Sequence, residues 1–353
     1  MMSERISLPG GPVWCALIFS LIGSLIGETL ATTTHPVTPR FRSKLAIAAL
    51  LLLSAIVLFA GSFYLFPGFY FTQIQRYRTW RMGLQSQSVM LNGYPIHYLV
   101  AGEGKPIVLI HGLAGHAEDW LPITPELTHK GYKVYALDLL GFGRSAKPDV
   151  DYSVALETSI VRQFVDSQKL QQPDVAGWSM GGWIGLKFAA ENPDRVHRLV
   201  LIDSAGLTFD AVNAGALRPK NEVELAHLME VLSPHPRPIP SFYARDLLRK
   251  FADEDWITDR ALKSMRTGKD LMDRKMDTVK MPVLIVWGDQ DVLTPLTIGE
   301  QMHAAMPQSV LQVVHGCGHM APVECSPRVS AAMVQFLEAN PPLLPTRKEL
   351  VER

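Results

Sequence analysis

A serine flanked by glycines places the strongest constraint on what this chain can fold into. The pentapeptide GWSMG at residues 177–181 follows an apolar run at 173–178 and precedes a helical pattern at 180–192. Between a strand and a helix, G-x-S-x-G is typical of a sharp turn that lifts the serine hydroxyl above a sheet edge. Glycine is needed where a Cβ atom would collide with the turn, and the dipole of the following helix favours developing negative charge. We therefore expect Ser179 to be a nucleophile rather than a structural turn serine.

Short apolar runs alternate with helical patterns over most of the chain, and such runs are typical of strands buried on both faces of a sheet. Their order predicts an α/β fold with a mostly parallel sheet flanked by helices. We expect strands at residues 96–101, 106–111, 133–139, 173–178, 197–204, 281–288 and 309–314, and helices at 153–169, 180–192, 295–305 and 328–339.

A nucleophilic serine needs a base, and the loop after the last expected strand offers His319 behind the glycines of residues 316–318. A positioned general base contributes about 10²–10⁴-fold to such reactions. A third group must orient the imidazole. We expect Asp291 in this role, with Asp289 and Asp203 as lesser alternatives. The order serine, acid, histidine is the one that this strand–turn–helix architecture uses.

The loop at residues 111–115, HGLAG, follows the expected strand 106–111. In this architecture the oxyanion is bound by the backbone N–H after the nucleophile and by one from this loop. We expect these donors to be Met180 and Leu113. His111 is expected to hold the loop rather than to take part in the chemistry.

About 75 residues without a strand pattern separate the strands expected at 197–204 and 281–288. They are rich in Leu, Met, Arg and Pro and look helical at residues 222–232, 241–251 and 259–265. A long segment at this place is usually functional. We expect residues 208–280 to form a helical cap between two parts of one core, residues 81–207 and 281–340, followed by a tail at 341–353.

The N-terminal region, residues 1–80, is expected to be a membrane anchor. Residues 45–66 are long and apolar enough for a transmembrane helix, and a buried core helix is the alternative. A second apolar segment, residues 13–26, fits a second span, a signal-like segment or an interfacial helix. Three basic residues precede residues 45–66 (Arg40, Arg42, Lys44) and three follow it (Arg76, Arg78, Arg81), so charge leaves the side of the catalytic domain open.

The composition argues against several other classes of protein. Lys plus Arg and Asp plus Glu are equal at 34 each, which leaves no electrostatic footprint for nucleic acid. The three cysteines (Cys15, Cys317, Cys325) suggest neither a disulfide framework nor zinc spacing. We expect Cys317 and Cys325 to be small, semi-buried apolar residues. No metal site and no cofactor are expected, and the sequence does not indicate an oligomeric state.

Five motifs in order resemble the α/β-hydrolase superfamily over roughly residues 87–339: HGLAGH (111–116), DLLGFGRS (138–145), GWSMGG (177–182), WGDQD (287–291) and GCGHMAPVE (316–324). The resemblance is to capped serine esterases and meta-cleavage-product hydrolases, and with an N-terminal anchor to membrane-bound monoacylglycerol lipases. It places the catalytic acid on Asp291 and the histidine on His319. Haloalkane dehalogenases and epoxide hydrolases of this fold use an aspartate nucleophile, whereas this chain has Ser179.

These features predict a serine hydrolase that cleaves a lipophilic, monoacylglycerol-like carboxylic ester through an acyl-enzyme on Ser179. Its partners would be that small-molecule ester and membrane lipid around the anchor. Three alternatives stay open: a carbon–carbon bond hydrolase of meta-cleavage-product type, an acyltransferase, and a membrane-tethered binding protein on an inactive hydrolase scaffold. Fold resemblance alone does not decide between them.

Overall fold

The computed structural model describes residues 39–350, with side chains from residue 43. The apolar segment at residues 13–26 therefore lies outside the described residues. The chain divides into two units between Gly61 and Ser62. The second unit holds the sheet and all of the candidate site residues.

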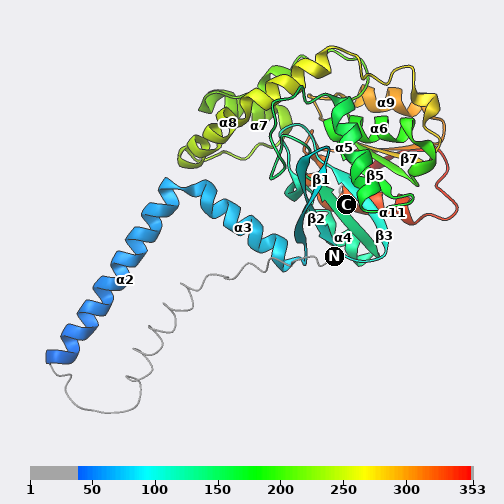
Figure 1. Cartoon of the computed structure of the whole chain (residues 1–353). Coiled ribbons are helices and arrows are strands. Elements are labelled where there is room, and N and C mark those ends of the chain that lie inside the picture. Colours follow the sequence, from blue (N-terminus) through cyan, green and yellow to red (C-terminus); the bar gives the residue numbers. More distant parts are fainter. Residues whose placement is uncertain (1–38, 351–353) are drawn as a thin grey trace. The chain divides into compact units, whose positions relative to one another are not determined.

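The described residues form one sheet, which Figure 1 shows flanked by helices. Its strand order is β1-β2-β4-β3-β5-β6-β7-β8-β9. The β1–β2 and β2–β4 pairs are antiparallel and the others are parallel. The α/β class expected from the sequence is confirmed. The strands are β1 (Gln85–Leu91), β2 (Tyr94–Ala101), β3 (Lys105–Ile110), β4 (Tyr132–Leu137), β5 (Asp174–Trp178), β6 (Leu199–Ile202), β7 (Val283–Gly288), β8 (Ser309–Val314) and β9 (Thr346–Leu350).

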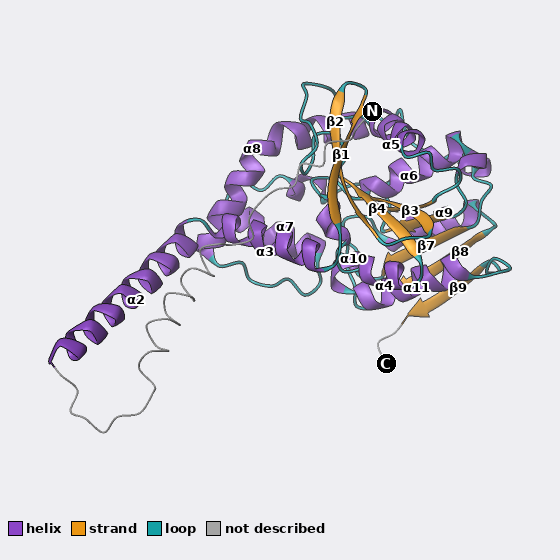
Figure 2. Ribbon diagram, turned by 60° about the horizontal axis from the view of Figure 1, so that its bottom comes forward, coloured by secondary structure: helices purple, strands orange, loops and turns teal. Residues whose placement is uncertain are grey.

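Two edge strands, β1 and β9, were not expected from the sequence, and they lie at opposite edges of the sheet (Figure 2). Most β1 side chains are exposed, and β9 alternates between half-buried and exposed positions. Both strands contain too many polar residues to be recognised in the sequence as apolar runs. The segment expected to be a tail, 341–353, therefore contributes a strand that pairs with β8.

Helices cover both faces of the sheet. Alternate residues of the central strands point into two separate apolar clusters, as the period of a strand requires. One cluster includes side chains of α5 (Val154–Ser167), α6 (Met180–Glu191) and α9 (Leu296–Ala305). The other includes side chains of α4 (Thr124–His129) and α11 (Ser326–Glu338). This burial on both faces explains the continuous apolar runs of β6 and β7 and of β5 after Asp174.

The insertion between β6 and β7 is helical. It contains α7 (Glu222–Leu232) and α8 (Ser241–Arg266), which pack on each other around Leu225, Leu228 and Ala244 (Figure 1). Two short helices were expected where α8 runs as a single helix. Residues 252–258 contain neither glycine nor proline, so nothing in the backbone breaks the helix there.

Helix α2 (Pro39–Leu65) contains the apolar segment, and α3 (Pro67–Arg81) follows it. Within α2, the 23 residues Ser43–Leu65 are long and apolar enough to cross a membrane. At 1.5 Å per residue they extend about 34 Å, against roughly 30 Å for a hydrocarbon core. In the second unit, α3 contacts α8, where the backbone N–H of Gly68 donates to Asp246 Oδ2 at 2.7 Å.

A buried acid on α5 makes the stability of the fold depend on pH. Burial raises the pKa of Glu157 to about 8, although the backbone N–H of Leu140 donates to its carboxyl. The unfolded chain releases this proton near pH 4.5, so the free energy of unfolding should fall as pH rises from about 4.5 to 8. By pH 7 the free energy of unfolding should have fallen by on the order of 3 kcal/mol from its value below pH 4.5.

We expect Glu157→Gln to flatten this slope, because an amide stays neutral at every pH. Urea unfolding of the detergent-solubilised chain between pH 5 and 8 measures the effect. Glu126→Gln, at an exposed position on α4, is the matched control and should keep the wild-type slope. Equal slopes for wild type and Glu157→Gln would contradict the prediction.

Candidate active site

Ser179 stands at a sharp turn between β5 and α6. Its φ and ψ angles are 57° and −121°, a strained region for a residue with a side chain. A Cβ atom on Gly177 would overlap the carbonyl oxygen of Gly181, and one on Gly181 would overlap that of Ile110. The two glycines of the motif therefore let the turn approach β3 and α6 closely.

The structure brings the three residues singled out from the sequence into one hydrogen-bonded chain. His319 Nε2 lies 2.9 Å from Ser179 Oγ, and His319 Nδ1 lies 2.8 Å from Asp291 Oδ2. The side chains of His319 and Asp291 are 4% and 0% exposed, so little water competes for these contacts. A neutral imidazole with its proton on Nδ1 can accept the serine proton at Nε2 while donating to Asp291.

Of the three acids considered from the sequence, Asp291 is the one that contacts His319. Its Oδ1 accepts hydrogen bonds from the backbone N–H groups of Leu293 and Thr294 at 2.8 and 2.9 Å. Asp289 instead lies 2.8 Å from His315 Nδ1. Asp203 is fully buried and accepts from the N–H of Gly288 at 2.8 Å. Burial, and then the negative charge of Asp291, raise the pKa of Asp203 well above its usual value, which favours a neutral carboxyl.

The loop after β3 lies directly beside Ser179. A Cβ atom on Gly112 would be 3.6 Å from Ser179 Oγ, and Leu113 lines the same cavity as the serine. His111 holds this loop: its Nδ1 donates to Gly112 O at 2.7 Å and its Nε2 accepts from the N–H of Leu139 at 3.0 Å. Burial lowers the pKa of His111, so the neutral form that makes both bonds is favoured.

A cavity of about 180 Å³ opens at Ser179 and His319. Much of its lining is apolar and comes from the insertion between β6 and β7 and from the loops beside the serine. Asp119 also lines the cavity, and its apolar side chains are Leu113, Ala114, Trp178, Leu217, Leu228, Leu232, Phe251, Leu293 and Met320. The site therefore offers a small, mostly apolar pocket next to a hydroxyl with an adjacent base.

A family model described as the alpha/beta hydrolase family matches residues 107–332. The chain belongs to the alpha/beta hydrolase family. Among solved structures, a bacterial membrane phospholipase A is 26% identical with a TM-score of 0.72, covering 84% of this chain and 100% of that one. A putative lipase from Acinetobacter baumannii AYE is also 26% identical, with a TM-score of 0.69 and coverage of 76% and 95%.

A curated relative of this α/β hydrolase is a 2-hydroxy-6-oxo-6-(2'-aminophenyl)hexa-2,4-dienoic acid hydrolase from Metapseudomonas resinovorans. It is 29% identical, over 70% of this chain and 89% of that protein. A membrane phospholipase A, a putative lipase and a dienoic acid hydrolase are thus all similar to this chain. The comparisons support a hydrolase and leave its bond specificity to the chemistry of the site.

Two residues that support the candidate triad of this hydrolase were not identified from the sequence. Thr294 Oγ1 lies 2.7 Å from Asp291 Oδ2 and 3.1 Å from His319 Nδ1. Trp178 Nε1 donates to the backbone oxygen of His319 at 2.7 Å. The position of Thr294, three residues after an aspartate in a loop, is a local pattern that could have indicated its role. The Trp178 contact joins residues 141 apart in the chain and has no comparable local pattern.

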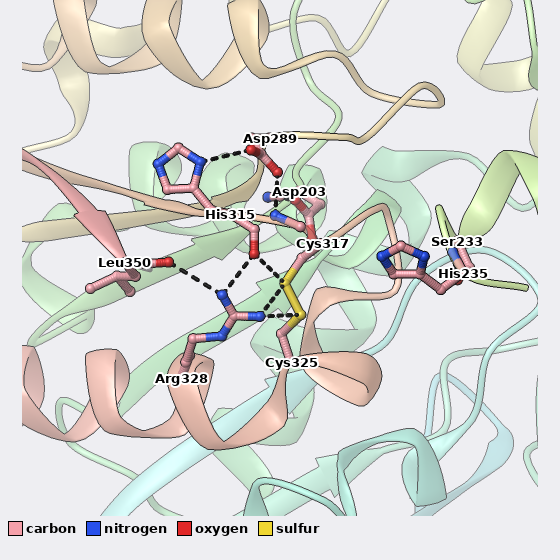
Figure 3. The surroundings of a disulfide bond; sticks show 11 residues. Asp203, Ser233, His235, Asp289, His315, Cys317, Cys325, Arg328 and Leu350 are labelled. Atoms are coloured by element: carbon pink, nitrogen blue, oxygen red, sulfur yellow. Dashed lines mark hydrogen bonds and ion pairs between the residues drawn. A yellow bond between two sulfur atoms is a disulfide. The ribbon is translucent and has the colours of Figure 1, made fainter. Parts of the chain in front are cut away.

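The expectation for Cys317 and Cys325 was wrong. The structure joins them in a disulfide, with Cα atoms 6.4 Å apart across a separation of eight residues (Figure 3). A count of cysteines could not show this, because the turn through α10 (Ala321–Glu324) brings the two together. Over residues 39–350, no group of three or more His, Cys, Asp or Glu side chains is arranged to hold a metal ion.

Proposed function

We propose that this protein is a membrane-anchored serine hydrolase that cleaves a lipophilic carboxylic ester. The observation that carries the proposal is the hydrogen-bonded chain from Ser179 through His319 to Asp291 beside an apolar cavity. The anchor would be the exposed apolar helix α2. A tethered site close to lipid suits an ester of the monoacylglycerol kind or another short acyl lipid.

The reaction would begin when Ser179 Oγ attacks the ester carbonyl carbon and passes its proton to His319 Nε2. Asp291 would stabilise the imidazolium, and the N–H groups of Leu113 and Met180 would bind the oxyanion. As the carbon–oxygen bond breaks, His319 would protonate the departing alcohol. Water would then attack the acyl-enzyme and lose a proton to His319. His319 would return this proton to Ser179 Oγ as the bond to the acyl group breaks and the acid leaves.

Two features support a lipophilic substrate. The cavity beside Ser179 is lined by leucines and a phenylalanine of the insertion, which suit an acyl chain better than a charged group. Two solved structures similar to this chain are described as a phospholipase A and a putative lipase. Cleavage of a carbon–carbon bond in a vinylogous diketone is the second candidate, because a 2-hydroxy-6-oxo-6-(2'-aminophenyl)hexa-2,4-dienoic acid hydrolase is similar to this chain.

A series of p-nitrophenyl esters of increasing acyl length tests the proposal. Each methylene that enters an apolar pocket contributes about 0.8 kcal/mol, so kcat/KM should rise by up to about fourfold per methylene until the pocket is full. Leu228→Ala should weaken this dependence because Leu228 lines the pocket. Val223→Ala, on the same helix but 80% exposed, is the matched control.

A flat response of the wild-type protein to acyl length would count against a lipophilic ester. Rapid loss of the visible absorbance of a ring-cleavage product, together with slow ester hydrolysis, would favour the carbon–carbon bond hydrolase. Transfer of the acyl group to added glycerol would instead indicate an acyltransferase. Each result thus separates one open alternative from the others.

A further inference from the structure

The disulfide closes the loop that carries His319. Cys317 lies two residues before the histidine and Cys325 six residues after it. Both cysteines are buried, at 0% and 6% exposure. The ends of this loop are therefore fixed to each other covalently, within a part of the protein that solvent hardly reaches.

Arg328, on α11, links the disulfide to the edge of the sheet (Figure 3). Its Nη1 donates to the carbonyl oxygens of His315 and Leu350 at 2.7 and 3.3 Å. Its Nη2 lies 3.1 and 3.2 Å from the sulfur atoms of Cys317 and Cys325. One guanidinium group thus connects the ends of β8 and β9 with both sulfurs.

The same loop is joined to the loop that carries Asp291 and to α7 of the insertion. The carbonyl oxygen of Cys317 accepts from the N–H of Gln290, the residue before Asp291, at 3.0 Å. The N–H of Met320, the residue after His319, donates to Leu232 of α7 at 3.2 Å. A displacement of Cys317 would therefore reach the histidine, the loop of the acid and the cap together.

We propose that the Cys317–Cys325 disulfide, with Arg328, positions His319 against Ser179 and Asp291, and that the catalytic unit works in an oxidising compartment. The positioning of His319 rests on the proposed function, whereas the assignment of the compartment does not. Disulfides persist in secreted, periplasmic and cell-surface proteins but are kept reduced by thiols in the cytosol. The basic residues on either side of residues 45–66 left the side of the catalytic domain open. An oxidising compartment would place that domain on the side of the membrane away from the cytosol.

The Cys317–Cys325 bond would form by thiol–disulfide exchange with the disulfide of an oxidant protein. The two cysteine thiols lose two protons and two electrons as the sulfur–sulfur bond forms, and the disulfide of the oxidant is reduced to two thiols. A dithiol reductant reverses the step. The burial of both sulfurs would slow this reversal once the chain has folded.

Counting thiols in cells tests the compartment. The full chain with Cys15→Ser, expressed in a Gram-negative host, would be quenched in acid and treated with maleimide-polyethylene glycol. In the normal host we expect the protein to carry no maleimide groups before reduction and two after reduction. In a host that lacks its periplasmic dithiol oxidase, we expect two maleimide groups on the protein without reduction. Two additions before reduction in the normal host would overturn the assignment. This measurement does not depend on any hydrolase activity.

Kinetics of the detergent-solubilised chain test the positioning role. Cys317→Ala with Cys325→Ala should lower kcat between about 10- and 100-fold with KM changed less than about twofold, because small misplacements of catalytic groups cost rate. The concentration of active sites would be measured by fluorophosphonate titration, so that unfolded molecules do not lower the calculated kcat. Reduction of the wild-type protein should have the same effect, and reoxidation should restore kcat.

An unchanged kcat per titrated site, with only a lower Tm, would overturn the positioning role and leave the disulfide a purely structural one. If the wild-type protein reacts neither with fluorophosphonate nor with any ester, the proposed function fails and the positioning role fails with it. The thiol count would still decide the compartment in that case. Failure of the function and failure of the inference are therefore distinguishable.

Discussion

Ser179→Ala is expected to lower kcat for ester hydrolysis by about 10⁴–10⁶-fold. The variant has no hydroxyl to form an acyl-enzyme, and only the oxyanion donors and substrate binding would remain. Its stability should stay close to that of the wild type, since alanine meets the same backbone strain as serine at a φ of 57°. Hydrolysis of the best ester from the acyl series, together with thermal unfolding, measures both quantities.

Fluorophosphonate labelling gives the sharpest readout of this variant. The wild-type chain should be labelled and Ser179→Ala should not. Ser204→Ala is the matched control, because Ser204 is buried at the end of the neighbouring strand, where its hydroxyl donates to Ala205 O. Labelling that persists in a folded Ser179→Ala protein would place the activated serine elsewhere in the chain.

Asp291→Asn is expected to lower kcat by about 10⁴-fold. An amide nitrogen facing His319 Nδ1 would favour the wrong imidazole tautomer, and the amide could not stabilise the imidazolium. The backbone N–H groups of Leu293 and Thr294, which now donate to a carboxylate, would also lose a charged acceptor. Steady-state hydrolysis from pH 6 to 9 measures the loss.

Two neighbouring acids provide the controls for Asp291→Asn. Asp289→Asn should have a small effect, because Asp289 contacts His315 and Gly316 rather than His319. Asp203→Asn should also be mild, because burial already favours the neutral form of Asp203. A loss of about 10⁴-fold in Asp203→Asn with activity retained in Asp291→Asn would transfer the role of catalytic acid to Asp203.

The sequence was informative wherever a local pattern controls local structure. The runs that became β3, β5, β6, β7 and β8 are mostly apolar because most of their residues are buried on both faces of the sheet, so they could be predicted without a structure. The turn at Ser179 could be read because it needs glycine at fixed offsets. The length of α8 was misread, since helix continuity depends on the absence of a breaker as well as on apolar periodicity.

Edge strands were the weakest part of the prediction. Strand β1 has mostly exposed residues and is held by its register with β2, from Gln85 opposite Val100 to Leu91 opposite Tyr94. Strand β9 is held by its pairing with β8. Backbone hydrogen bonds to a neighbour stabilise such strands, and these leave little trace in side-chain polarity.

The sequence by itself determined the fold class, the family and the candidates Ser179, Asp291 and His319, because strand–turn–helix chemistry and motif order are local properties. Only the tertiary structure decided which acid meets the histidine, that Thr294 and Trp178 support it, and that Cys317 is bonded to Cys325. Asp291, Thr294 and Trp178 all meet His319 from segments that lie far away in the chain, and the turn through α10 brings the two cysteines together. The contacts with His319 depend on how the sheet brings distant segments together, which a local pattern does not encode.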